Sequence, residues 1–208
     1  MADVNPVALA VGDGLVVVIG TGGKVYSAGT VCGPRSATLV QSAATFMTPS
    51  AVAVASYVVS EGLPSGHACI ADTTTLRCFG QNDSNQVSPT PGCVSADSPT
   101  TVVEPASAGW ASTPGSVSLA TRHSYAINSA GKLDCWGANE RGELGAMPAV
   151  ITAPKLCDPD GGWTEISTSV HHSCGIENGQ VYCWGINMYG ELGVEPHFHD
   201  TPVAVTLP

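Results

Sequence analysis

One short segment occurs twice in this chain, and this repetition constrains the fold more than any other feature. The first copy runs from Cys135 to Gly145 (Cys-Trp-Gly-Ala-Asn-Glu-Arg-Gly-Glu-Leu-Gly), and the second runs from Cys183 to Gly193 (Cys-Trp-Gly-Ile-Asn-Met-Tyr-Gly-Glu-Leu-Gly). Weaker copies begin near Arg77 and Val25, so successive copies lie roughly fifty residues apart. Such a chain is an array of one supersecondary unit, and its fold follows from that unit.

The local sequence is typical of β-strands. Val117–Ala120 and Glu165–Val170 are short, rich in apolar or β-branched residues, and bounded by turn formers. No stretch carries an apolar pattern at helical spacing, and 24 Gly and 15 Pro interrupt the chain throughout. We therefore expect one all-β domain over residues 1–208 with antiparallel sheets. The repeats are expected at approximately 7–47, 48–97, 98–149 and 150–193.

A Pro-x-Val type strand precedes each of the last three copies, and a similar segment, Thr201–Val205, is left over at the end. We expect 201–208 to be a closing or orphan strand. It could complete the first sheet and close a small ring, complete a sheet in a second chain, or mark the point where a longer array is cut. An open array exposes two strand edges, so a homodimer through those edges is one expectation.

Turn chemistry predicts how the hairpins are paired. Asn178-Gly179 is a strong signal for a type I′ turn, and it places Cys174 opposite Cys183 in a non-hydrogen-bonded pair. Strands approach closely there, which suits a disulfide. Cys69 and Cys78 have the same spacing around a Thr73-Thr74 tip. We predict the disulfides Cys69–Cys78 and Cys174–Cys183.

The other two hairpins differ. A tip at Gly22-Gly23 would place Val18 opposite Ser27, and an extra turn residue leaves Cys135 opposite Tyr125. Four cysteines stay without an assigned partner, and their three possible pairings are left open: Cys32, Cys93, Cys135 and Cys157.

The copies resemble the repeats of the regulator of chromosome condensation family, whose members form β-propellers. The resemblance rests on His172–Ile176, Gly179–Gly185 and Asn187–Gly193, and on the matching third-copy segments His123–Ala126, Gly131–Gly137 and Gly142–Gly145. It implies a propeller of about four blades. Because family rings are larger than this, we expect an open arc. The cysteine pairs are similar to those of bacterial secreted or surface versions. The repeat residues with an expected structural role are Trp136, Gly137, Gly142, Gly145, Trp184, Gly185, Gly190 and Gly193.

Charge and cysteine content limit the partners and the compartment. The net charge is −10 with only seven Lys and Arg, which argues against nucleic acid and anionic membranes. No apolar stretch is long enough for a membrane-spanning helix. Eight cysteines favour an oxidising compartment, hence an extracellular, cell-surface or periplasmic location. Residues 1–20 make a poor signal peptide, so a cytoplasmic location with free thiols is the alternative.

No catalytic constellation is visible, and we expect no enzyme activity, no cofactor and no metal. Cys174 and Cys183 beside His172 fit a disulfide better than a zinc site. His197 and His199 lack a third ligand nearby in the sequence. A histidine recurs at one repeat position (His67, His123, His172), which indicates a structural hydrogen bond to a neighbouring strand.

The leading hypothesis is a protein-protein interaction scaffold whose loops present the binding surface to a protein partner. The loops that vary most among copies are Arg77–Thr101, Pro105–Gly115 and Ala146–Gly162. The resemblance also implies two alternatives. One is a guanine nucleotide exchange factor for a small GTPase, like the founding member. The other is a polypeptide inhibitor of an enzyme, like the β-lactamase-inhibiting propellers that resemble this family.

Overall fold

The computed structural model describes residues 5–32, 36–46, 49, 51–58, 64–72, 75–102, 109–145, 150–158 and 160–207. Within them the regular structure is all-β apart from one short 3₁₀ turn, Thr21–Gly23. The strands form four antiparallel sheets of four strands, each with its strands in chain order. The predicted all-β propeller class is confirmed. We call each sheet a blade and number the blades along the chain.

Blade 1 contains β1 (Pro6–Val11), β2 (Leu15–Gly20), β3 (Lys24–Gly29) and β4 (Ser36–Thr45). Blade 2 contains β5 (Ala51–Val58), β6 (Pro64–Ala71), β7 (Leu76–Gly80) and β8 (Thr100–Val102). Blade 3 contains β9 (Val117–Leu119), β10 (His123–Ile127), β11 (Leu133–Ala138) and β12 (Val150–Asp158). Blade 4 contains β13 (Trp163–Thr168), β14 (His172–Glu177), β15 (Gln180–Gly185) and β16 (His199–Val205).

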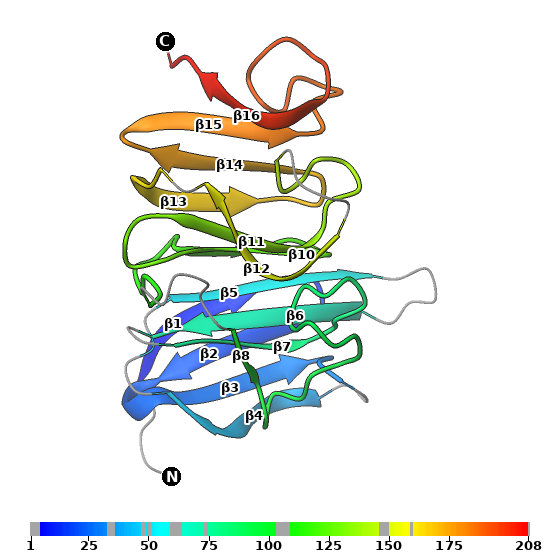
Figure 1. The fold of residues 1–208 in the computed structure, drawn as a ribbon. Coiled ribbons are helices and arrows are strands. Elements are labelled where there is room, and N and C mark those ends of the chain that lie inside the picture. The colour runs from blue at the N-terminus through cyan, green and yellow to red at the C-terminus, as the bar shows by residue number, and fades with distance from the viewer. Residues whose placement is uncertain are drawn as a thin grey trace.

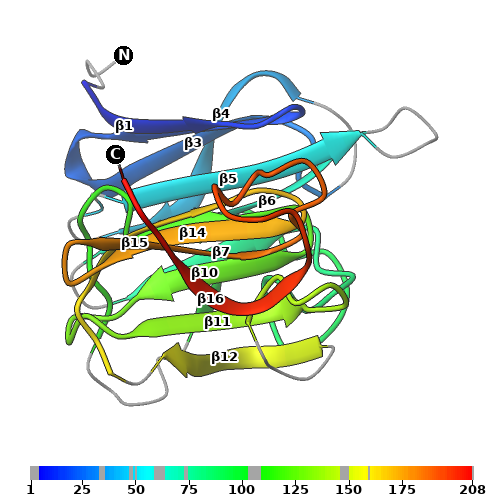
Figure 2. The same cartoon turned by 90° about the horizontal axis from the view of Figure 1, so that it is seen from above.

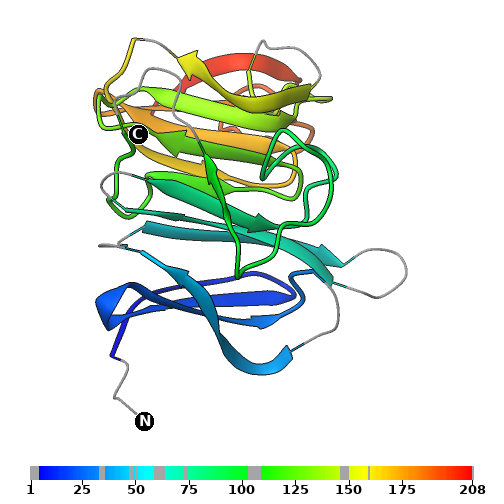
Figure 3. The ribbon, with the colours of Figure 1, turned by 60° about the horizontal axis from the view of Figure 1, so that its bottom comes forward.

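The blades are stacked face to face in chain order (Figure 1). Blade 1 lies at one end of the stack and blade 4 at the other, and the tilted view of Figure 3 also shows blade 1 at the lower end with blade 2 next to it. Seen from above, the blades overlie one another, and the two termini come close only in projection (Figure 2). The four blades therefore form an open arc, and their first and last sheets do not meet.

The boundaries between the blades differ from the boundaries expected for the sequence repeats. Strand β8, expected to open the repeat 98–149, pairs with β7, and β12 likewise pairs with β11. Residues 201–208 were expected to close a ring or remain unpaired, but β16 pairs with β15 as the last strand of blade 4. The repeat period shows how many units the chain contains, and it does not show where each sheet begins, because that depends on which neighbour each outer strand pairs with.

Three of the hairpins have the register that the turn chemistry predicts. Cys174 lies opposite Cys183, Cys69 opposite Cys78, and Tyr125 opposite Cys135. The Thr73-Thr74 tip itself lies outside the described residues. The prediction for the first hairpin is wrong, since Val18 lies opposite Tyr26. The reason is that three residues, Thr21–Gly23, form this turn, so the pairing moves by one residue.

The core is divided between two clusters of buried apolar side chains. The cluster between blades 1 and 2 consists of aliphatic residues and two phenylalanines, among them Leu15, Val17, Ile19, Ile70 and Phe79. The cluster that links blades 2, 3 and 4 contains all four tryptophans: Trp110, Trp136, Trp163 and Trp184. The first interface is thus purely aliphatic and aromatic, whereas the later ones also have to satisfy buried indole N–H groups.

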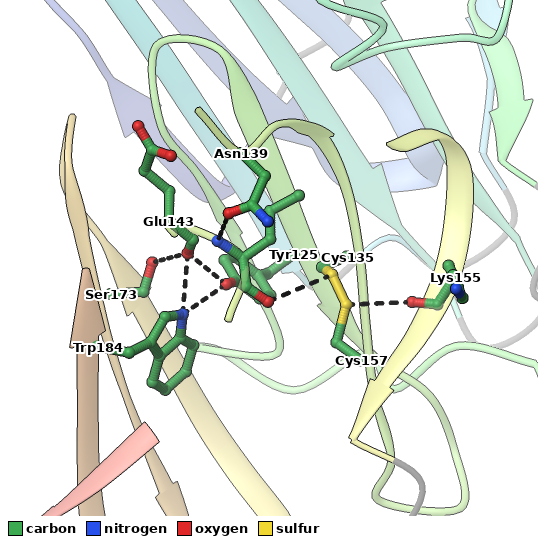
Figure 4. Close-up of a disulfide and its surroundings, with 9 residues drawn as sticks. Tyr125, Cys135, Asn139, Glu143, Lys155, Cys157, Ser173 and Trp184 are labelled. Atoms are coloured by element: carbon green, nitrogen blue, oxygen red, sulfur yellow. Dashed lines mark hydrogen bonds between the residues drawn. A yellow bond between two sulfur atoms is a disulfide. The ribbon is translucent and has the colours of Figure 1, made fainter. Parts of the chain in front are cut away.

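One carbonyl oxygen joins blade 3 to blade 4 (Figure 4). The indole Nε1 of Trp184 donates to the carbonyl oxygen of Glu143 at 2.9 Å, and the hydroxyl of Ser173 donates to the same oxygen at 3.3 Å. The hydroxyl of Tyr125 reaches it from within blade 3 at 2.6 Å. All of these groups are buried. We call a carbonyl oxygen that accepts from a tryptophan and a serine of the next blade an inter-blade latch.

The boundary between blades 2 and 3 has the same inter-blade latch. The carbonyl oxygen of Gln86 accepts from Trp136 Nε1 and from Ser124 Oγ, both at 2.8 Å. The boundary between blades 1 and 2 has none, because Phe79 and Ala68 stand in blade 2 where blades 3 and 4 have tryptophan and serine. These two side chains pack in the aliphatic cluster instead.

A histidine lies beside each complete inter-blade latch. His67 Nε2 lies 3.2 Å from Ser124 Oγ in the next blade, which is the kind of contact expected for this recurring position. Among the described residues, His123 Nε2 is buried without a hydrogen-bond partner. Burial lowers the pKa of both His67 and His123 to about 3, with nearby His67 and His171 contributing for His123. Both rings are therefore neutral in the folded protein at ordinary pH.

Four disulfides connect the eight cysteines. Cys69–Cys78 and Cys174–Cys183 cross hairpins with Cα atoms 4.1 Å apart, the close approach of a non-hydrogen-bonded pair. Cys135–Cys157 joins β11 to β12. Cys32–Cys93 spans 61 residues and ties blade 1 to the loop after β7. A loop of that length gives roughly 4 kcal/mol of stabilisation in the chain-entropy model.

We predict that the fold loses stability as the pH falls from about 6.5 towards 3. Unfolded histidines bind protons near pH 6.5, whereas buried His67 and His123 bind them only near pH 3. The unfolded state therefore holds more protons within this window. Each histidine should lower the free energy of unfolding by about 1 kcal/mol per pH unit. Urea denaturation between pH 5 and 6.5 measures this slope.

The matched variant is His67→Gln, which keeps a hydrogen-bonding group near Ser124 but does not titrate. Its stability should depend less steeply on pH than that of the unchanged protein. An equal slope in the two proteins would show that His67 is not held neutral.

A second prediction compares two glycines that both have positive φ, Gly137 at 103° and Gly190 at 85°. A β-carbon on Gly137 would collide with the carbonyl oxygen of Arg122, whereas one on Gly190 would have no atom within 4 Å. We expect Gly190→Ala to lower the free energy of unfolding by about 1 kcal/mol, and Gly137→Ala by about 3 kcal/mol or more. Thermal or urea unfolding of both variants tests this, and equal losses would contradict it.

Candidate protein-binding surface

The loops that leave the third strands of blades 2, 3 and 4 share an internal scaffold. In blade 4, Asn187 Oδ1 accepts from the backbone N–H of Leu192 at 3.0 Å, and its Nδ2 donates to the carbonyl oxygen of Glu195 at 2.8 Å. Asn139 and Asn82 accept from the equivalent backbone N–H groups of blades 3 and 2, both at 2.8 Å. These asparagines are buried, so each loop is supported from within.

The tip of the blade 4 loop is apolar, unlike its counterpart in blade 3. Met188 and Tyr189 are 72% and 91% exposed, and they stand where blade 3 has Glu140 and Arg141. Phe198, near the end of the same loop, is 50% exposed. We call Met188, Tyr189 and Phe198 the Tyr189 patch. Clustered exposed apolar side chains of this kind are typical of sites that bind other proteins, and Tyr, Phe and Met are enriched in such sites.

The patch borders an open depression between the loops of blades 3 and 4. The residues that line it are Glu140, Arg141, Ile186, Asn187, Met188, Pro196, His197 and Phe198. Arg122 pairs with Glu140 at 3.2 Å on its edge, but both side chains are about half exposed, so this ion pair adds little stability. The lining thus combines apolar side chains with the charged residues Glu140 and Arg141, which suits a protein surface that carries an apolar side chain and flanking charges.

The backbone beneath the patch is held in place. The N–H of Tyr189 donates to the carboxylate of Glu191 at 2.8 Å, and hydrogen bonds from the amides of this turn lower the pKa of Glu191. The ring of Phe198 lies over Gly142 of blade 3, where an added β-carbon would come within 2.8 Å of its Cζ. A surface ordered before binding loses little entropy when it binds.

The described part of the chain contains no group of three or more His, Cys, Asp or Glu side chains placed to hold a metal ion. His197 and His199, the pair considered from the sequence, have ring centroids 3.9 Å apart. Their ring planes are tilted by 45° to each other, and the two residues flank Phe198 in the sequence.

The repeat residues singled out from the sequence lie in the scaffold. Trp136 and Trp184 donate in the two inter-blade latches. Gly137 is the second-last residue of β11 and Gly185 the last of β15, and they lie close to the carbonyl oxygens of Arg122 and His171. The remaining four lie in the loops of blades 3 and 4, all with positive φ: Gly142, Gly145, Gly190 and Gly193.

The longest of the predicted binding loops, Arg77–Thr101, is bound to the scaffold over much of its length. Cys93 is bridged to Cys32, and Ser42 Oγ donates to the carbonyl oxygen of Ala96 at 2.6 Å. Asn82 and Gln86 in its first part are buried. This loop therefore connects blade 1 to blades 2 and 3. Much of the segment 146–162 is strand β12, and 105–115 is described only from residue 109.

The residues of the Tyr189 patch were missed from the sequence. The signal was present in the alignment of the two best copies, where Met188-Tyr189 replaces Glu140-Arg141 inside an otherwise matching segment. Apolar residues that replace charged ones at an exposed loop tip indicate a surface with a task other than solubility. Phe198 carried no such signal, because it lies beyond the repeated segment.

Within the described residues, no helix is long and apolar enough to cross a membrane.

No protein-family model matches the chain, and no curated protein matches it significantly. Two solved structures superpose over all of this chain. Human WBSCR16 gives a TM-score of 0.75 at 16% identity, and yeast RCC1 (Prp20) bound to Kap60 gives 0.77 at 17%. A structure of Prp20p from Saccharomyces cerevisiae, described with its binding properties to Gsp1p and histones, gives 0.62 at 15% over 98% of this chain.

The chain spans 55% of WBSCR16, 50% of Prp20 in the Kap60 complex, and 64% of the other Prp20p structure. At these identities the likeness concerns the fold, and it supports the propeller type that the repeats implied. The four stacked blades of this chain therefore have the fold of an arc of an RCC1-like β-propeller.

Proposed function

We propose that this protein is a non-enzymatic scaffold that binds a protein partner through the Tyr189 patch. The observation that carries the proposal is the exposure of Met188, Tyr189 and Phe198 on a loop supported from within by Asn187. Large exposed apolar side chains reduce solubility, so their presence on a rigid turn is best explained by a partner that covers them. Residues of this kind tend to dominate binding energy, about 2 kcal/mol or more each at the centre of an interface.

The matched loop of blade 3 provides a variant that should leave the fold intact. Met188→Glu with Tyr189→Arg gives the blade 4 loop the tip that blade 3 already carries. We expect this double variant to keep its thermal stability and to lose partner binding by at least tenfold, which corresponds to about 1.4 kcal/mol. Leu39→Ser, on β4 of blade 1, removes another exposed apolar side chain (53% exposed) and serves as the control.

The partner can be found by replacing Tyr189 with a photo-crosslinking phenylalanine analogue and exposing the protein to its native surroundings. One defined protein should be crosslinked from position 189, and none from position 39. Purified, that protein should bind the unchanged chain and the Leu39→Ser variant equally. Equal binding to the Met188→Glu, Tyr189→Arg variant would contradict the proposed surface.

Guanine nucleotide exchange is the second candidate, because yeast RCC1 is among the proteins with the same fold. It is tested by the release of a fluorescent guanine nucleotide from a small GTPase in the presence of the chain. Under our proposal the release rate is unchanged. Accelerated release would place the exchange activity first. An inhibitor of an enzyme is a special case of the scaffold, in which the partner held by the patch is an enzyme.

We also propose an extracytoplasmic location, which is supported by the four disulfides. The intact mass of protein from its native source should be lower by eight hydrogens than after reduction, two for each of the four disulfides. Eight free thiols would point to the cytoplasm instead.

A further inference from the structure

The outward face of blade 4 repeats the face with which blade 3 contacts blade 4, but nothing in the described chain covers it. Glu143, on the covered face of blade 3, is 5% exposed, whereas its counterpart Glu191 is exposed. His123 is buried, whereas its counterpart His172 is half-buried. The difference is the one expected if a further sheet normally packs here.

The face also presents a carbonyl oxygen, that of Glu191, which is equivalent to the acceptors of the two inter-blade latches. Gln86, Glu143 and Glu191 each follow the loop asparagine of their blade by four residues. The carbonyl oxygens of Gln86 and Glu143 accept a tryptophan and a serine from the next blade. In the described residues no group donates to the carbonyl oxygen of Glu191. The loop that presents it is already built, because Asn187 bonds Leu192 as Asn139 bonds Leu144.

In each inter-blade latch, the blade that supplies the serine and tryptophan donors also supplies a basic residue. It stands directly before the recurring histidine and reaches back to the loop of the preceding blade. Arg122 Nε donates to Ser84 Oγ at 2.8 Å, and His171 Nδ1 lies 3.6 Å from Glu143 Oε1. Glu191 offers a carboxylate at the position of Glu143. The face of blade 4 is therefore complementary in charge to an incoming basic side chain.

The free face at the other end of the arc cannot supply these donors. Blade 1 aligns with the others through the pair Leu15 and Gly29, which matches His123 with Gly137 and His172 with Gly185. In that alignment Gly14, Val16 and Ala28 occupy the positions of the basic residue, the serine and the tryptophan. A second copy packed head to tail would bury the carbonyl oxygen of Glu191 against apolar groups and leave this acceptor unsatisfied, which is unfavourable.

We propose that the outward face of blade 4, centred on Glu191, is a docking surface for a further propeller blade from outside these 208 residues. That blade carries a basic residue, a serine and a tryptophan at the positions of His171, Ser173 and Trp184. It is recognised by two hydrogen bonds to the Glu191 carbonyl oxygen and one contact to its carboxylate. The inference does not depend on the Tyr189 patch. In blade 3, Glu140 and Arg141 stay exposed although blade 4 is docked, so Met188 and Tyr189 would stay exposed as well.

The test extends the whole chain with a blade of known sequence as the probe. A second copy of residues 158–208 follows residue 208, which brings one complete donor set beside Glu191. The matched control makes His171→Gly, Ser173→Ala and Trp184→Phe in the appended copy only, which gives it the donor-free residues of blade 2 (Gly66, Ala68 and Phe79). Urea denaturation and the NMR signal of the appended indole N–H are measured for both chains.

The chain with the complete copy should unfold in one transition, at a higher urea midpoint than the unextended protein. Its appended indole N–H should exchange at least tenfold more slowly than a solvent-exposed one. The control should gain less, or its appended blade should unfold separately. Equal stabilisation by both extensions, or by neither, would overturn the proposal. Sedimentation of the unextended protein should show a monomer, and a dimer that disappears in a Glu191→Lys variant would identify a second copy as the occupant instead.

Discussion

A carbonyl oxygen that accepts from the indole of one tryptophan and the hydroxyl of one serine is the contact on which the packing of blades 2, 3 and 4 depends. Apolar packing between stacked sheets is strong but tolerates sliding and rotation, whereas a buried carbonyl oxygen has to be satisfied at one position. The oxygen of Glu143 is held in place by the Asn139 loop and by the hydroxyl of Tyr125. The indole that donates to this oxygen belongs to Trp184, which stands directly before Gly185, the last residue of β15. Much of the repeated sequence motif can be understood as the set of residues that this contact requires.

The array uses two kinds of interface, which differ in the residues that the following blade contributes. Where the acceptor loop is present, as in blades 2 and 3, the next blade carries Ser124 and Trp136 or Ser173 and Trp184. At the first boundary the next blade carries Ala68 and Phe79, which pack against aliphatic side chains of β2. Phenylalanine has no N–H group that needs an acceptor, so it fits a boundary packed with aliphatic side chains. The weak early repeats thus reflect a different interface chemistry.

The features that depend on neighbouring residues could be predicted from the sequence. The Asn178-Gly179 turn determines the register of its hairpin by itself, so the position of Cys174 opposite Cys183 followed from counting. The glycine-rich turn after β2 could close with two or three residues, and the sequence did not distinguish these cases. The Cys32–Cys93 bridge, the pairing of each outer strand and the position of Phe198 over Gly142 depend on how separate segments meet in space. No alternation or turn signal carries that information.

Stacked repeats usually lose their terminal units first, because an end unit has one neighbour where an internal unit has two. Blade 1 is such a unit, and its boundary with blade 2 is the one without an inter-blade latch. The Cys32–Cys93 bridge fastens it to the loop after β7, a loop whose own first turns are buried against blade 3. Local unfolding of blade 1 therefore cannot separate it from the array, because the disulfide keeps it attached to this loop. Unfolding that begins at blade 1 must also displace the cross-linked loop. The covalent bond adds, at the boundary that lacks the inter-blade latch, a link between blade 1 and the rest of the array.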